Sequence, residues 1–202
     1  MKGFTVSLVG LCLLLVACKE KGDRVTVEET RPLTTRDQSP KLFATSDQRF
    51  RDAKPSPVQG QPPENWMTLP PAQFRELNYR FGESGMGEVY VSLSAGSLGE
   101  NVNRWLAQFG KSPLDQEGLA TLEKVNVVNT QGVWVQAAGD YKPAGPMGGA
   151  GGGAPKSGFG LAGVIAEVGG KILTVKMVGP QAEVEKEAAA LKAFAGTLTL
   201  VR

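Results

Sequence analysis

Pairs of alternating apolar and polar stretches, joined by short turns, constrain the fold of this chain more than any other feature. Alternation runs through 76–81 and again through 88–93, with a glycine-rich connection at 82–87. A period of two is typical of strands with one buried face, and a short glycine-containing connection indicates a hairpin. Further strands are expected at 124–128, 133–138, 158–168 and 171–178, with a short edge strand at 197–201.

Helical periodicity appears between and after these strands. Ser97 and Glu100 fit a capping box, and apolar residues then recur at helical spacing until Gly110, a typical C′ glycine. Ser112-Pro113 indicates the start of a short second helix, and 184–194 fits a closing amphipathic helix. The element order predicts an α+β fold, an antiparallel sheet of about six strands with helices packed on it.

The amino terminus reads as a targeting segment. Lys2 precedes an apolar run, Gly3 to Val16, which is shorter than the roughly 20 residues that span a bilayer. A secretory signal is therefore the expected reading. The run ends in Leu-Val-Ala-Cys at 15–18, which resembles the lipobox of bacterial lipoproteins. That resemblance implies cleavage after Ala17 and lipid attachment to Cys18; an ordinary signal peptide or an anchor helix is the alternative.

The anchor has consequences for the rest of the chain. Cys12 would leave with the signal, so that Cys18 becomes the one cysteine of the mature protein and no disulfide can form. Lys19 follows the cysteine, and the enteric sorting rule then points to the outer membrane. The expected location is the cell envelope, lipid-anchored, on the outer membrane facing the periplasm.

Composition divides the remaining chain into a tether and one domain. Residues 1–17 are the expected signal peptide, and 18–61 are polar, charged and poor in aromatics, as in a flexible tether. Residues 62–202 have the size of a single domain. A glycine-rich loop is expected at 145–155; it lacks the Lys-Ser/Thr ending of a phosphate-binding P-loop.

Several kinds of chemistry are excluded by what the sequence lacks. There is no histidine in the chain and no cysteine beyond Cys18, which removes the usual zinc, haem and iron–sulfur sites and histidine-dependent catalysis. Residues 61–202 carry 12 Lys and Arg against 13 Asp and Glu, without the basic clustering of a nucleic-acid-binding surface. No cofactor and no nucleic-acid partner are expected.

Two motifs carry a second resemblance. Asn101 to Gln108 reads N-x-N-R-W-x-x-Q, and Lys176 to Pro180 reads K-x-x-G-P. Together they resemble a group of uncharacterised exported proteins from planctomycete- and verrucomicrobia-like bacteria. The arrangement is also similar to the Mog1/PsbP-like sandwich, in which an antiparallel sheet lies between helices. The resemblance implies a fold and no mechanism.

A polar arc on the first helix supplies the candidate binding residues, Asn101, Arg104 and Gln108. Their amide and guanidinium groups suit fixed hydrogen bonds, so we expect them either to bind a peptide, glycan or carboxylate, or to tie the helix into the fold. Trp105 is expected in the core, whereas Trp66 and Trp134 could contribute to an exposed aromatic patch.

The expected function is a non-catalytic module that binds an envelope protein or polymer. The alternative is an envelope hydrolase that uses carboxylates without histidine, which needs two facing acids. The carboxylates considered, Glu76, Glu88 and Glu167, fall on strand positions expected to face water. A third possibility is an assembly accessory of the PsbP type. The oligomeric state is open.

Overall fold

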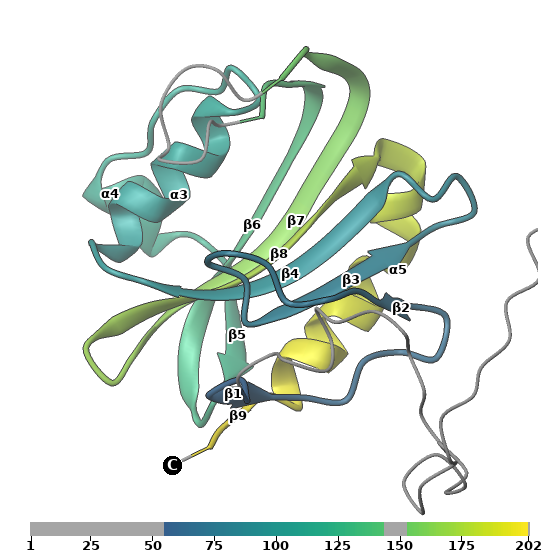
Figure 1. Ribbon diagram of the computed structural model, residues 1–202. Coiled ribbons are helices and arrows are strands. Elements are labelled where there is room, and N and C mark those ends of the chain that lie inside the picture. Colours follow the sequence, from purple (N-terminus) through teal and green to yellow (C-terminus); the bar gives the residue numbers. More distant parts are fainter. Residues whose placement is uncertain (1–54, 144–152, 202) are drawn as a thin grey trace, which may run out of the picture. The chain divides into compact units, whose positions relative to one another are not determined.

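The computed structural model describes residues 55–143 and 153–201 (Figure 1). Ala17, Cys18, the tether up to residue 54 and most of the glycine-rich loop lie outside the described residues. Within the described part of the chain, no helix is both long enough and apolar enough to cross a membrane.

The expected α+β class is confirmed, with a main sheet of seven strands rather than about six. Its strands follow the order β2-β3-β4-β8-β7-β6-β5, and every neighbouring pair is antiparallel. The strands are β2 (Met67–Thr68), β3 (Leu77–Phe81), β4 (Gly87–Ser94), β5 (Lys124–Val127), β6 (Thr130–Tyr141), β7 (Lys156–Val168) and β8 (Lys171–Pro180).

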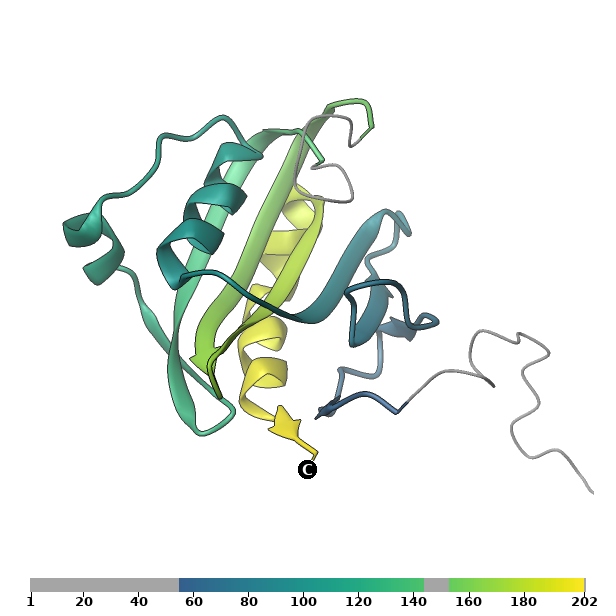
Figure 2. The same cartoon turned by 60° about the vertical axis from the view of Figure 1, so that its left-hand side comes forward.

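Two helices cover opposite faces of this sheet, α3 (Leu98–Ala107) and α5 (Gln181–Gly196) (Figure 2). The central strands β7 and β8 are apolar on both sides, because each side is covered by a helix. The α5 face holds Leu173, Val175 and Met177 of β8, whereas Ile172 and Val178 belong to the cluster under α3.

Helix α3 begins as the sequence predicts. The Ser97 hydroxyl accepts from the Glu100 amide, and the Glu100 carboxylate accepts from the Ser97 amide at 2.9 Å, which completes the capping box.

The second helix does not begin where the sequence predicts. The short helix α4 (Gln116–Ala120) is capped by Asp115 rather than opened by Ser112-Pro113, because the Asp115 carboxylate accepts from the Gly118 amide.

The turn before β6 also differs from the prediction. Val128 and Asn129 both have positive φ and make a two-residue turn, so that β6 begins at Thr130, inside the expected loop.

The expectation that Trp66 or Trp134 contributes to an exposed aromatic patch is wrong. Trp134 is 5% exposed and belongs to the α5-side cluster, and Trp66 is equally buried against Tyr79 and Phe194.

A second, two-stranded sheet joins β1 (Val58–Gln59) to β9 (Thr199–Leu200). Val58 is fully buried, so the fold begins before residue 62, within the segment expected to be tether. The expected short edge strand near the C-terminus is β9, although its partner is β1 and not the main sheet.

Candidate functional site

An open cavity of about 1020 Å³ lies on the face of the sheet that carries α3. Strands β4 and β8 supply its floor, α3 supplies one wall, and the segment before β3 supplies another. It is lined by side chains of both polar and aromatic character: Phe74, Arg75, Glu88, Tyr90, Ser92, Arg104, Trp105, Gln108, Tyr141, Lys156, Phe159, Thr174, Lys176 and Val178.

Strand register explains which side chains reach this floor. On β4, Val89 and Val91 belong to the core under α5, so the alternate positions Glu88, Tyr90 and Ser92 face the α3 side. The pairing places Tyr90 opposite Lys176 on β8 and Lys176 opposite Gly163 on β7. Lys176 therefore sits in the middle of a cross-strand row.

Gly163 leaves room above this row for an indole ring. A Cβ at Gly163 would lie 2.6 Å from Trp105 Cζ3, and closer still to the Val175 carbonyl oxygen. Trp105, as expected from its helical position, is buried at 3% exposure. Because its ring occupies the place of the missing side chain, it comes within 5.2 Å of the Lys176 ammonium, measured from the ring centre to Nζ.

Lys176 is the unusual residue of the site, since it is a lysine at 1% exposure. Its Nζ donates to the Gln108 side-chain oxygen and lies 5.7 Å from the centre of the Tyr141 ring. No carboxylate among the described residues forms an ion pair with it. A buried charge is costly unless it is paired, so this amine has an incomplete set of partners.

The pKa of Lys176 is lowered from 10.5 to about 7; burial is the largest cause, the nearby Arg104 and Arg75 cations add to the lowering, and Glu88 opposes it. Burial also raises the pKa of Tyr90 and of Tyr141 above the ordinary tyrosine value. The tyrosines therefore stay neutral at neutral pH, whereas Lys176 changes charge close to it.

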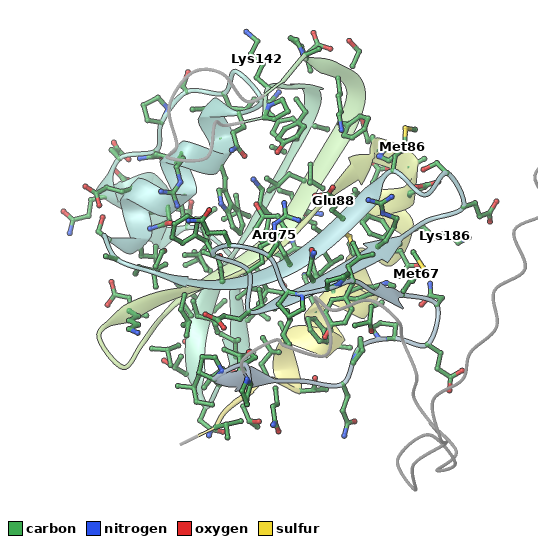
Figure 3. The ribbon with its side chains drawn as sticks, viewed as in Figure 1. Met67, Arg75, Met86, Glu88, Lys142 and Lys186 are labelled. Atoms are coloured by element: carbon green, nitrogen blue, oxygen red, sulfur yellow. The ribbon has the colours of Figure 1, made fainter. Side chains whose placement is uncertain are left out.

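The one carboxylate among the described lining residues, Glu88, is already paired. Arg75 Nη2 lies 3.2 Å from Glu88 Oε2, and Figure 3 shows the two side chains together over β4. The Arg75 guanidinium also lies 4.3 Å from the centre of the Tyr90 ring and donates to the Asn78 side chain. Glu88, expected to face water, has a side chain that is 35% exposed; β4 turns it toward the open cavity, where Arg75 pairs with it.

The three candidate residues of α3 have different places in the structure. Asn101 is 1% exposed, donates to the Ser97 carbonyl at 2.8 Å and accepts from Arg104, which ties it into the start of the helix. Arg104 and Gln108 line the cavity, and Gln108 holds Lys176. Arg104 and Gln108 therefore lie at the cavity, whereas Asn101 is buried at the start of α3.

The sequence marked Lys176 only as the first residue of the K-x-x-G-P motif and not as a binding residue, and it singled out neither Tyr90 nor the segment around Phe74. A signal for Lys176 was present, because it is the one charged residue inside 172–178, a run otherwise apolar on both faces apart from a threonine. Phe74 carries a signal only in three dimensions. It is 64% exposed on the cavity rim and has φ of 64°, a conformation that costs an aromatic residue free energy and that clusters at functional sites.

Metal chemistry finds no donor set here. Among residues 55–143 and 153–201, no group of three His, Cys, Asp or Glu side chains could hold a metal ion. The functional groups of the cavity are cations, amides, hydroxyls, aromatic rings and the one carboxylate of Glu88, which is paired with Arg75.

Comparison with known proteins gives distant structural likenesses. A protein from Bacteroides thetaiotaomicron is 12% identical with a TM-score of 0.42; 72% of this chain is covered, and the chain spans 46% of that protein. LpqN, involved in cell envelope biogenesis of Mycobacterium tuberculosis, is 11% identical with a TM-score of 0.40, covering 72% of this chain and 83% of that one. The cyanobacterial PsbP (CyanoP) of Synechocystis is 9% identical with a TM-score of 0.39, covering 72% and 94%.

No protein-family model and no curated protein matches the sequence. The solved structures similar to the chain thus include a PsbP protein, the type that the sequence resemblance named. Likenesses at these TM-scores do not assign the chain to a family.

Proposed function

We propose that this chain is a lipid-anchored cell-envelope protein whose folded domain is a non-catalytic binding module, with its ligand held in the cavity beside α3. The observation that carries the proposal is the cavity of about 1020 Å³ with a buried, incompletely partnered lysine in its floor. Ligand sites are typically concave, largely apolar and furnished with a few convergent polar groups. The partner is an envelope molecule, protein or polymer, that places a group in this cavity.

A hydrolase acting through carboxylates is less well supported. Such chemistry needs two facing acids, one of them with a raised pKa. The described residues of the cavity supply only Glu88, and Arg75 holds it in an ion pair. A binding role uses the same groups without requiring a second acid.

The anchor is part of the proposal. The lipobox at 15–18 supplies a lipidated Cys18 on the outer membrane, facing the periplasm, and the segment that follows supplies a tether. A flexible chain of about 40 residues has a root-mean-square reach of roughly 35 Å, enough to carry the domain clear of the headgroup layer.

Replacing the lipidated cysteine is expected to abolish both lipidation and removal of the signal peptide. Cys18→Ser should lose its palmitate labelling and keep residues 1–17, because a lipobox without its cysteine has no thiol for the thioether-linked lipid and no cleavage site of this type. Metabolic labelling with palmitate and the size of the band on an immunoblot measure this. Cys12→Ser is the matched control and should leave both readouts unchanged. Palmitate labelling that persists in Cys18→Ser would rule out the anchor.

Blocking the cavity is expected to reduce ligand capture from envelope extract. Ala95 is exposed on the cavity wall, so Ala95→Trp places a large ring there without disturbing the core. Ala107, exposed on α3 outside the cavity lining, gives the control Ala107→Trp. The immobilised Ala95→Trp protein should capture at least fivefold less envelope material than the wild type, whereas Ala107→Trp should capture as much. Circular dichroism checks that both variants are folded. Equal capture by all three proteins, or none by the wild type, would contradict the proposal.

A further inference from the structure

We infer that the ligand of this cavity carries one anionic group, a carboxylate or a phosphate, beside an apolar body, and that Lys176 is the residue that pairs with the anion. This inference rests on the proposed function and names the chemical class of its ligand. It is carried by the charge balance of the cavity, by the position of Lys176 in the floor and by the aromatic side chains around it.

The charge balance favours an anion. The described lining contains four basic side chains and one acidic side chain: Arg75, Arg104, Lys156, Lys176 and Glu88. Arg75 is satisfied by Glu88 at 3.2 Å. No ion pair forms between the other three cations and the carboxylates of the described chain. The cavity therefore has an excess of positive charge, which an entering anion would neutralise.

Of these cations, Lys176 should attract an anion most strongly, because its ammonium group is buried away from water. An ammonium has three donors, and the one hydrogen bond it makes within the described residues goes to Gln108. The facing rings of Trp105 and Tyr141 offer only cation–π contacts, at 5.2 and 5.7 Å from their centres. Electrostatic attraction is stronger in such a site than in water, so a ligand anion would gain more here than at a surface lysine.

Exposed Arg104 lies beside this amine on α3 as a second cation. Its guanidinium donates to Asn101 of its own helix, which fixes its direction and leaves further donors free. Gln108, the C-cap residue of the same helix, holds Lys176. Hydrogen bonds therefore position both cations: Asn101 holds Arg104, and Gln108 holds Lys176. Asn101 itself lies outside the cavity.

Aromatic and aliphatic side chains surround the charged floor and suit an apolar body. Tyr141 and Phe159 are stacked with ring centres 6.2 Å apart, and Val178 follows Lys176 on the same face of β8. Phe74 and Met86 stand at the rim, 64% and 53% exposed. Large apolar side chains held in the open next to a cationic floor match an amphipathic anion better than a small inorganic one.

Two fluorescent probes with the same aromatic body test the inference. Anilinonaphthalene sulfonate carries a permanent negative charge, and N-phenyl-1-naphthylamine lacks it. The protein is the full mature chain from residue 18, with Cys18→Ser so that no lipid is attached. Fluorescence titration at pH 6.5 and low salt is expected to give a Kd for the sulfonate at least tenfold below that of the neutral probe.

Two lysines of the same strand provide the variant and its control. Lys176→Met should raise the Kd of the sulfonate at least tenfold and leave the Kd of the neutral probe within twofold, which also shows that the cavity is intact. Lys171→Met removes an exposed charge at the start of β8 and should change neither constant. If the two probes bind the wild type equally, or if Lys176→Met retains the preference, the anion inference is wrong. If neither probe binds, the proposed function itself fails.

The pH dependence gives an independent check. The groups facing Lys176 are Arg104 from α3, Arg75 from the segment before β3, Glu88 and Tyr90 from β4, and Tyr141 from β6. The two tyrosines remain neutral below pH 9 because their pKa values are raised. Since the sulfonate does not titrate, its Kd should be constant below about pH 7 and rise above it as Lys176 loses its proton. A flat profile from pH 6 to 9 would contradict the role of Lys176.

Competition separates the two anion types. Decanoate, decyl phosphate and decanol share one apolar chain, and each is added to the protein loaded with the sulfonate probe. Both acids, or one of them, should displace the probe at concentrations at least tenfold below decanol, and the more effective acid identifies carboxylate or phosphate as the preferred group. Displacement by decanol at the same concentrations would overturn the inference.

Discussion

Lys176→Met is expected to raise the free energy of unfolding by about 3 kcal/mol at pH 6.5, an unusual direction for a core substitution. Folding buries the Lys176 ammonium without a carboxylate partner and lowers its pKa from 10.5 to about 7. Methionine fills the same volume without this penalty. The loss of the hydrogen bond to Gln108 and of the cation–π contact offsets part of the gain. Urea unfolding followed by circular dichroism measures the difference.

The advantage of methionine depends on pH in a defined direction. Below about pH 7 Lys176 is charged in both states, and the folded state bears the full cost of burial. Between about 7 and 10.5 the unfolded chain binds more protons, so wild-type stability from this group rises with pH and the difference shrinks. Lys171→Met, on the exposed end of the same strand, should show neither effect. A destabilised Lys176→Met at pH 6.5 would contradict this account.

The stability expected from Lys176→Met matters for function as well. A residue that lowers stability where an apolar one would serve is kept for something other than folding, and functional sites commonly carry such a cost. Together with the binding test, the substitution should give a protein that is more stable and has lost its preference for anions. The two readouts separate a ligand-binding lysine from one that merely fills the core.

Gly163→Val is expected to lower the free energy of unfolding by about 3 kcal/mol, because the site has no room for a side chain. Its Cβ would overlap the Val175 carbonyl oxygen and the Trp105 ring. Either the β7–β8 ladder opens or the indole leaves its place above the sheet, and α3 moves with it. Denaturant unfolding measures the loss. Sulfonate-probe binding should weaken in the same variant, since Trp105 and Gln108 flank Lys176 from α3.

Gly196, the last residue of α5, is the control position for this prediction. Apart from its chain neighbours and the backbone of its own helix, no atom lies within 4 Å of a Cβ built there, and its backbone does not need glycine. Gly196→Ala should leave stability unchanged or raise it by up to about 1 kcal/mol. If Gly163→Val were as stable as the wild type, the close approach of Trp105 to the sheet would not be part of the fold.

The sequence was sufficient for those elements whose signals are local. The capping box at Ser97 and Glu100, the alternation in β3 and β4 and the helical spacing of α5 depend on neighbouring residues only, and the structure confirms these elements. The start of α4 was missed because two capping signals lie three residues apart, at Ser112 and Asp115. The Asp115 carboxylate caps the helix through the Gly118 amide, and the Asn103 side chain of α3 bonds the Leu114 backbone just before it.

The candidate site could be predicted only in part, for a reason that lies in the sheet. Alternation identifies the two faces of a strand and does not show which of them a helix covers. Trp134 was therefore expected outside, although α5 covers it, and Glu88 was expected in water, although it lines the cavity. The helical wheel located Arg104 and Gln108, but their meeting with Lys176, 68 positions away from Gln108, required the tertiary fold.

The small sheet of β1 and β9 has a mechanical consequence. Any tension along the segment that precedes the domain enters the fold at Val58, and β1 passes it through two residue pairs to Thr199 and Leu200, just beyond α5. The load is then borne by a short ladder and the buried Val58 side chain, remote in sequence from the strands that line the cavity. Under force, this two-residue ladder should separate before the seven-stranded sheet does.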